Sequence, residues 1–390
     1  MENILGAVRY GIKISKKEKN PDERVTYIHD AKDLQPARMN FDTGVFEYGS
    51  WQGRAFAAPE NNYPCMVKAD GTEDYKLMQE DYTKKEDGAE SDVVNADYAG
   101  NAMAAFKGGW LCQYETETDE YIIWSNVKYD DAYNARHRKA KDGSIREGFY
   151  RHIYKPTLID GKARSISGAE IMGGFTAQQE RQLCKANGEE WEQSTWQQWN
   201  YIICLLKIMA KTDDLQAAYG YGNCDNPAWE ALPTGTLNDK GQFYGSREKD
   251  KQVKVFHTEA LWGDKWERLA GLIVDNGTVK VHTHGEYNFT GEGYKSIYRY
   301  MTNDFDYGFV DGTVMTPYGR FPVSFNGSRH EYTADYGAID TEIVSAPLVG
   351  GDCDYGLNCG AYVHLSNTAG SACWYVAPGL SCIMPNAAQQ

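Results

Sequence analysis

The feature that most limits the fold of this chain is how often glycine, asparagine and aspartate interrupt its apolar runs. Past Gly220 the candidate strands are all short, and they lie at 253–257, 272–274, 279–282, 321–324 and 343–348. Such runs are typical of short strands joined by loops. The 390 residues include 39 glycines and 28 tyrosines, a composition that favours a β- and loop-rich protein with flat amphipathic rings at its surface over a helical bundle.

Two helices are predicted, near 177–186 and 196–210. Each follows a capping-box pattern, in which a threonine, Thr176 or Thr195, is followed three residues later by a glutamine. In the second helix large apolar side chains recur at steps of three and four residues, namely Trp196, Trp199, Ile203, Leu206 and Met209. We therefore expect it to be the best-buried helix of the chain.

Two helices packed on many short, mostly antiparallel strands with long loops predict an α+β fold rather than a parallel doubly wound sheet. A hairpin is expected where 110–115 and 121–125 flank an acidic turn. The charged, glycine-punctuated segment 84–92 suggests a boundary. We expect a small β-rich N-terminal region over 1–95 and a main domain over 96–390.

Charge and apolar content exclude several classes of partner. The net charge is −15, which repels phosphate backbones, so nucleic-acid binding is not expected. No apolar stretch approaches the roughly 18 residues that a membrane-spanning helix needs, so membrane insertion is not expected either. The start, Met1 to Gly6, lacks the charged and apolar regions of a secretory signal, and we expect synthesis in the cytosol.

Common catalytic and metal-binding motifs are absent from the sequence. The nine cysteines include no C-x-x-C pair, so free thiols are expected instead of structural zinc. Phosphate-loop, dinucleotide, serine-hydrolase and zinc-protease signatures are missing. His282 and His284, with Glu286 nearby, would share one face of a strand, but a polar loop end is the favoured interpretation over a metal site. We expect no cofactor and no enzymatic activity.

The functional prediction depends on the segment from Gly350 to Cys382. It begins with paired glycines, continues through further spaced glycines and many Tyr, Asp and Cys residues, and ends with Gly379-Leu380-Ser381-Cys382. It closely resembles the variable region of proteins that are diversified by retroelements, such as phage receptor-binding tropism determinants. Upstream, the run from Leu261 to Arg268 looks like the central Trp-containing motif of that family.

This resemblance implies both a fold and a function. The fold would be the C-type lectin fold of the formylglycine-generating type. The protein would be a receptor-binding protein of a phage tail or tail fibre, made in the host cytoplasm and carried on the virion. It would bind a bacterial surface protein or glycan through a variable surface at about 350–382 and would contact other tail proteins. Several copies, for example a homotrimer, would supply avidity, and the region 1–95 would serve virion attachment or oligomerisation.

Codon logic offers a check on the resemblance. Mutagenesis in such families falls on adenines, so an Asn codon of the form AAY cannot become Lys, Glu, Gln, Met or Trp. The positions that would be Asn in an undiversified template all carry residues from the reachable set, and they are Asp352, Asp354, Tyr355, His364, Ser366, Cys373 and Tyr375. An exposed free thiol such as that of Cys373 is seldom selected for function, yet a random codon readily produces it.

The resemblance also implies a set of site residues. The expected ligand-binding residues are Asp352, Cys353, Asp354, Tyr355, Asn358, Cys359, Tyr362, His364, Ser366, Cys373, Trp374 and Tyr375. The expected scaffold residues are Gly350, Gly351, Gly356, Gly360, Trp262 and Trp266. Whether Trp374 and Tyr362 face solvent or the core stays open. The run Ala377-Pro378-Gly379 departs from the glycine-led turn that relatives have, which puts the register of the last strand in doubt.

Two alternative functions stay open. The first is a copper-dependent oxidase of the formylglycine-generating type that uses Cys353 and Cys359, although their spacing and their Asn- and Gly-rich surroundings match that enzyme poorly. The second is a retroelement-diversified surface protein of a bacterium, which the missing signal sequence disfavours.

Overall fold

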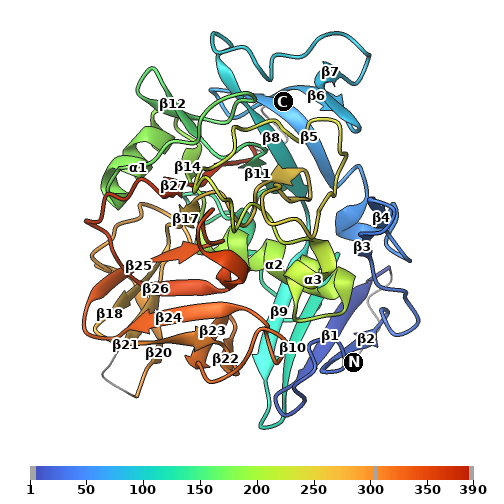
Figure 1. Cartoon of the computed structure of the whole chain (residues 1–390), viewed down its shortest axis with the longest axis vertical. Helices are drawn as coiled ribbons and strands as arrows, with labels where there is room; N and C mark the ends of the chain where they lie inside the picture. The colour runs from blue at the N-terminus through green and yellow to red at the C-terminus, as the bar shows by residue number, and fades with distance from the viewer. Residues whose placement is uncertain (1–5, 302–304, 386–390) are drawn as a thin grey trace.

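Strands dominate the computed structural model, which describes residues 6–301 and 305–385 (Figure 1). Strands make up 37% and helices 10% of the structure. Among the described residues only α1 (Ala177–Lys185) and α2 (Trp196–Ala210) are substantial helices, and α3 (Leu215–Tyr219) is a single short turn. The prediction of an α+β C-type lectin fold is therefore wrong, because the molecule is mostly β, with several antiparallel sheets and a curled half-barrel sheet.

The first large sheet shows why the helix-based prediction failed. It has seven strands, in the order β14 (Trp191–Gln193), β28 (Leu380–Ile383), β11 (Gly148–His152), β8 (Gly100–Lys107), β5 (Asn62–Lys68), β6 (Glu73–Met78) and β7 (Asp81–Lys85). Strands from both ends of the chain thus join one sheet. Short runs that look isolated in the sequence pair with distant partners. The sheets therefore contain far more residues than the two helices do.

A four-stranded antiparallel sheet lies at the N-terminal side of the molecule (Figure 1). Its order is β2 (Val25–His29), β1 (Arg9–Ser15), β10 (Asp119–Ser125) and β9 (Trp110–Glu115). The predicted hairpin over 110–125 is confirmed, since β9 and β10 pair antiparallel. Strand pairing crosses the boundary expected near residue 95, because β1 pairs with β10 and β5 with β8.

The nine-stranded sheet contains most of the C-terminal segment. Its main path runs through β20 (Lys295–Arg299), β19 (Thr278–Val281), β18 (Leu272–Asp275), β25 (Val344–Val349), β26 (Val363–Thr368), β24 (Tyr336–Asp340) and β21 (Phe305–Phe309). Beside this path, β17 (Trp266–Arg268) pairs with β25 and, in parallel, with β27 (Val376–Pro378). β26 lies between β25 and β24, just as β28 lies between β14 and β11 in the seven-stranded sheet.

Four two-stranded ribbons and three short 3₁₀ helices complete the elements of the described chain. The ribbons are β3 (Arg38–Asn40) with β4 (Val45–Glu47), β12 (Thr157–Ile159) with β13 (Lys162–Arg164), β15 (Lys254–Val255) with β16 (Thr258–Glu259), and β22 (Gly312–Thr316) with β23 (Gly319–Ser324). The 3₁₀ helices are Ala55–Ala57, Arg136–Arg138 and Gly356–Asn358. No helix in the described part of the chain is long and apolar enough to cross a membrane. Residues 1–5, which carry the expectation about secretion, lie outside the described residues.

The two predicted helices are confirmed together with their capping boxes. Thr176 accepts a hydrogen bond from the Gln179 amide, and Thr195 accepts one from the Gln198 amide. All residues of α2 are buried, so it is the best-buried helix, as predicted. Figure 1 shows α2 in the middle of the molecule, between the sheets.

A buried ionic network holds α2 to the strands around it. The carboxylate of Asp213 contacts the Nη1 atoms of Arg320, at 2.8 Å, and Arg24, at 3.3 Å, and also the ammonium of Lys207 on α2. Burial alone would raise the pKa of Asp213, but the three cations together hold it below its usual value. The network therefore joins the start of β2, the end of α2 and β23 through one carboxylate.

Candidate ligand-binding surface

Strand β26 divides its side chains between the core and the outer face of the nine-stranded sheet. Val363 and Leu365 are almost fully buried in the main core. His364 and Ser366 alternate with them and point to the opposite face, as the two-residue period of a strand requires. The outer face of β26 is therefore the part of this strand that can take part in a surface site.

The loop before β26 is fixed by glycines. Gly351 has a φ of +77°, and a Cβ atom there would lie 2.8 Å from Cα of Cys359 and closer still to its sulfur. The Cys359 thiol donates to the Asp352 carbonyl at 3.1 Å. The backbone amide of Asn226 donates to the Cys353 carbonyl at 2.8 Å, which ties the loop to a neighbouring segment. The loop is thus anchored on both sides, while Asp354 at its tip is exposed.

Two groups of rings lie on the outer face of this sheet and meet at the cluster around Trp266, and we name them together the aromatic face. Its members come from β21, β24 and two C-terminal loops, and they are Phe305, Tyr307, Phe309, Tyr336, Tyr355, Trp374 and Tyr375. Neighbouring ring centroids lie 5.2 Å apart for Phe305–Tyr307, 6.3 Å for Tyr307–Tyr336, 5.4 Å for Phe309–Tyr336, 5.9 Å for Tyr336–Tyr355 and 5.7 Å for Trp374–Tyr375. Tyr355 and Tyr375 pack on one cluster around Trp266.

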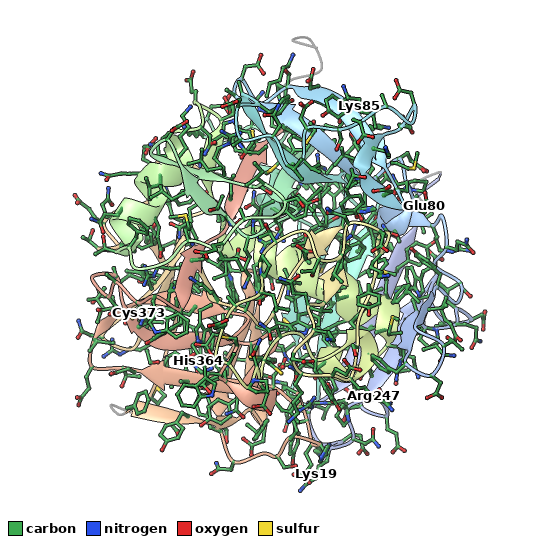
Figure 2. All side chains as sticks on the ribbon, turned by 45° about the horizontal axis from the view of Figure 1, so that its top comes forward. Lys19, Glu80, Lys85, Arg247, His364 and Cys373 are labelled. Atoms are coloured by element: carbon green, nitrogen blue, oxygen red, sulfur yellow. The ribbon has the colours of Figure 1, made fainter. Side chains whose placement is uncertain are left out.

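Strand register explains why these rings share a face. In the antiparallel pair β21–β24, Phe309 is opposite Tyr336 and Tyr307 is opposite Ala338. In the parallel pair β24–β26, Ala338 is in turn opposite His364. Directly opposed residues point to the same side of a sheet. The alternate residues of all three strands therefore build one surface, and Figure 2 shows His364 and Cys373 on this side of the molecule.

Trp266 and His364 form the buried floor of the aromatic face. Their rings lie 4.5 Å apart, and Tyr355 covers both, with centroid distances of 5.0 Å to Trp266 and 5.5 Å to His364. Burial lowers the pKa of His364 to about 3, so its ring is neutral at pH 7. The floor is apolar and uncharged, which supports the rings above it without adding charge.

The rim of the aromatic face carries the charges. Asp354 is exposed, and its amide donates to Oδ1 of Asp352 at 3.2 Å. Burial raises the pKa of Asp352. The Lys265 ammonium lies 5.9 Å from the ring centroid of Trp374, and 54% of the Trp374 residue surface is exposed. A hydrogen bond with Cys373 and, to a smaller extent, burial raise the pKa of Tyr375 to about 12, so the phenol stays protonated at neutral pH.

The expected ligand-binding residues divide by burial. Asp354 and Trp374 are exposed, while Tyr355, Asn358, Ser366, Cys373 and Tyr375 are half-buried. The buried members are Asp352, Cys353, Cys359, Tyr362 and His364. Tyr362 faces the core, where the Lys207 ammonium lies 5.2 Å from its ring, whereas Trp374 faces solvent. The outward group belongs to the aromatic face and its rim, and His364 belongs to the floor.

The expected scaffold residues lie behind this surface. Trp262 is fully buried, and its indole donates to the Gly220 carbonyl at 3.0 Å. A Cβ atom at Gly350 would approach the Leu261 carbonyl oxygen at 2.9 Å. Gly360 lies against the carboxylate of Asp335, which accepts the Ala361 amide at 3.3 Å. Gly356 is different, because no atom lies within 4 Å of a Cβ built there.

The other candidate sites, around His282 and His284 and around Cys353 and Cys359, are less suited to binding a metal or to catalysis. Glu286 pairs with Arg181 at 2.8 Å and with Lys185 at 2.7 Å, so this carboxylate is already engaged and not turned toward the two histidines. Within residues 6–301 and 305–385 no group of three or more His, Cys, Asp or Glu side chains could hold a metal. The Cys359 thiol has Cys224 as its hydrogen-bonding neighbour, and burial raises the pKa of both Cys359 and Cys353.

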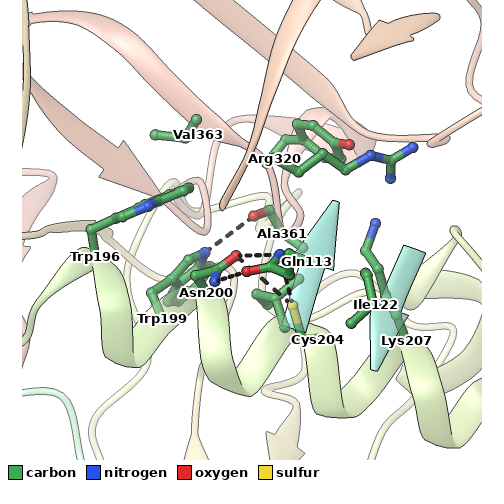
Figure 3. Close-up of a pocket in the computed structure, with 12 residues that line it drawn as sticks. Gln113, Ile122, Trp196, Trp199, Asn200, Cys204, Lys207, Arg320, Ala361 and Val363 are labelled. Atoms are coloured by element: carbon green, nitrogen blue, oxygen red, sulfur yellow. Dashed lines mark hydrogen bonds between the residues drawn. The ribbon is translucent and has the colours of Figure 1, made fainter. Parts of the chain in front are cut away.

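An internal cavity beside α2 is too small for a ligand. Figure 3 shows its lining, where the amide of Asn200 donates to the Gln113 side-chain carbonyl at 2.7 Å. Its volume is about 30 Å³, which is about the space of one water molecule. This cavity is therefore not a candidate ligand site.

Sequence reasoning missed the contribution of β21 and β24 to this surface. Phe305, Tyr307 and Phe309 alternate with Asp306 and Gly308, and this two-residue period is a strand signal that the C-terminal resemblance did not cover. Tyr336 carries no such local signal. It joins the site only because β24 pairs with both β21 and β26. No family model matches the chain, and no curated protein matches it either.

Proposed function

We propose that this protein is a non-enzymatic receptor-binding protein of a phage tail or tail fibre, diversified in its C-terminal segment. Its aromatic face would contact a protein or glycan on the bacterial surface. The observation that carries the proposal is the position of these rings. Tyr355, from the segment 350–382, contacts Tyr336 of β24, and both Tyr355 and Tyr375 pack on the cluster around Trp266.

The chemistry of the face suits recognition. Tyrosine and tryptophan present large, rigid contact areas and lose little conformational entropy on binding. Such side chains dominate the binding energy of interfaces when they are surrounded by groups that exclude water. Trp374 and Tyr375 stand at one end of the face with their rings perpendicular, at an interplanar angle of 88°. They are therefore the best candidates for the residues on which affinity depends.

The division between outward and buried positions supports tolerance to variation. Asp354, Cys373 and Trp374 can change without opening a core cavity, because solvent covers part of each. The loop and strand beneath them are held by glycine turns and by the pairing of β26 with two neighbours. We propose that diversification acts on the outward positions, and that several copies per virion, for example in a homotrimer, supply avidity.

Binding to intact cells tests this proposal. Fluorescently labelled full-length protein is incubated with a panel of bacterial strains, and strain-selective binding is expected. Trp374→Ala and Tyr375→Ala should each weaken binding by at least about tenfold, as loss of an interface anchor does. Phe41→Ala is the matched control, because Phe41 is also a half-exposed ring with one cation nearby, the Arg247 guanidinium at 4.8 Å. Figure 2 shows Arg247 well away from Cys373, the neighbour of Trp374 in the sequence.

Two outcomes would overturn the proposal. One is that no strain binds the protein, and the other is that Phe41→Ala reduces binding as much as Trp374→Ala does. Unfolding free energies of the variants should stay within about 1 kcal/mol of the parent, as is usual for surface changes. A second experiment sequences the DNA flanking the gene. A repeat of the segment encoding about 350–382, differing mainly at adenines, is expected beside a reverse-transcriptase gene.

A further inference from the structure

A second surface feature lies away from the aromatic face and shares no residue with it. It is a groove of about 550 Å³, within the range of about 300–1,000 Å³ that is common for ligand sites. Its walls come from β1, β9, the loop at 129–133, the 3₁₀ helix Arg136–Arg138, β20 and the turn between β22 and β23. We name it the tyrosine groove, after the tyrosines in its walls: Tyr114, Tyr129, Tyr133 and Tyr318.

Three cations in this groove lack a carboxylate partner. Arg9, Arg136 and Lys295 all line it, and among the described residues none of their side-chain cations forms an ion pair with a carboxylate. The Arg9 backbone amide donates to Asp30 at 2.7 Å, and the Arg136 guanidinium donates to the Pro317 carbonyl. Of the two acidic residues in the wall, Asp131 pairs with Lys128 at 2.6 Å, and Asp130 accepts the Ala132 amide at 2.8 Å. The Asp130 carboxylate keeps its negative charge, so the three cations leave the groove with an excess of positive charge in a protein whose net charge is −15.

Tyrosine rings hold these cations in place. The Arg9 guanidinium lies 4.1 Å from the ring centroid of Tyr129, and the Arg136 guanidinium lies 4.0 Å from that of Tyr318. The Lys295 ammonium donates to the Tyr318 hydroxyl at 3.1 Å. Burial alone would raise the pKa of Tyr318, but the positive charges of Lys295 and Arg136 together lower it below its usual value. The cations are thus positioned before any ligand arrives, which reduces the entropy lost on binding.

We propose that the tyrosine groove binds an anionic saccharide. Its carboxylate or phosphate would accept hydrogen bonds from Arg9, Arg136 and Lys295, since such charge-assisted bonds are among the strongest in proteins. The apolar faces of the sugar would pack on tyrosine rings, whose hydroxyls can bond sugar hydroxyls. Tyr114 offers such a ring, because it is 41% exposed and stacked on Tyr121 at 4.5 Å. This site is independent of the proposed aromatic-face interaction.

Isothermal titration calorimetry of the full chain tests this proposal. The probes are trigalacturonic acid, which carries carboxylates, glucose 6-phosphate, which carries a phosphate, neutral maltotriose and inorganic phosphate. At least one of the two anionic saccharides should bind, more weakly as sodium chloride is raised, and maltotriose should not. Binding of trigalacturonic acid would show that the groove takes a carboxylate, and binding of glucose 6-phosphate would show that it takes a phosphate. Tighter binding of the saccharide than of inorganic phosphate is expected from the ring contacts.

Paired variants locate the site. Lys295→Gln and Arg9→Gln should each weaken saccharide binding by about tenfold, the effect of losing one charge-assisted hydrogen bond. Arg299→Gln is the matched control, because Arg299 is exposed on the same strand as Lys295 but does not line the groove. The proposal is overturned if neither anionic saccharide binds, if inorganic phosphate binds as tightly as they do, or if Arg299→Gln weakens binding as much as Lys295→Gln.

Discussion

Replacing Gly351 by alanine should destabilise the protein far more than the same change at Gly356, five residues along the same loop. Both glycines have positive φ, +77° and +61°, a conformation that costs other residues about 1–2 kcal/mol. Only at Gly351 does the new methyl group also collide with the chain. It would lie 2.8 Å from Cα and 2.9 Å from Cβ of Cys359, atoms that cannot rotate away.

The structure sets the size of this difference. Forcing a methyl group into a packed site costs about 1–3 kcal/mol, so Gly351→Ala should lower the free energy of unfolding by about 2–5 kcal/mol in total. At Gly356 no atom lies within 4 Å of the new group. The loss there should be about 1 kcal/mol, because alanine also restricts the unfolded chain.

Urea denaturation of the two variants and the parent measures this difference. The slope of free energy against urea should be the same in all three proteins, so that midpoints report stability alone. Gly356→Ala should also leave the proposed binding to bacterial cells unchanged. Equal losses at the two positions would refute the reasoning, because they would mean that the loop moves freely away from Cys359.

Three further predictions concern buried and half-buried groups. Burial raises the pKa of Asp335 from 3.8 to about 7. Between these two pH values the Asp335 side chain keeps its proton in the folded protein but has lost it in the unfolded chain. Stability from this group is complete below pH 3.8 and falls as pH rises toward 7, and Asp335→Asn should remove this part of the slope in denaturation curves taken from pH 4 to 8. Asp213→Asn should lower the free energy of unfolding by about 3–5 kcal/mol, because it breaks a buried ionic network; a loss below about 1 kcal/mol in urea would contradict the role given to that network. Cys373 is the one cysteine of the nine that is not buried, so Ellman's reagent should label one thiol rapidly in the native protein and none rapidly in Cys373→Ser.

Local signals in the sequence were enough to predict several elements. The threonine-to-glutamine spacing placed α1 and α2, and the acidic turn placed the hairpin of β9 and β10. These features depend on hydrogen bonds between residues a few positions apart. The fold class depends on distant pairings such as β11 with β28, which join residues near 150 and near 382. No local pattern specifies such a pairing, so the predicted fold was wrong.

The candidate site shows the same limit at the level of single residues. Tyr355, Trp374 and Tyr375 reach the surface, but His364 and Tyr362 do not. The two-residue period of β26 predicts that Leu365 and His364 point to opposite faces of the sheet. It does not predict that Trp266 and Tyr355 cover the His364 ring. Burial on the outer face of a sheet is set by what packs there. Here Trp266 comes from the distant strand β17, and Tyr355 comes from the loop just before β26.

The position of the C-terminal strands has a consequence for quality control in the cell. β26 and β28 are interior strands of the two largest sheets, and each has a neighbour on both sides. A chain cut short before Val363 would leave β24, β25, β11 and β14 with open edges, which are prone to aggregation. A truncated copy would therefore misfold and be removed as damaged protein, instead of persisting as a folded molecule that lacks only its C-terminal surface.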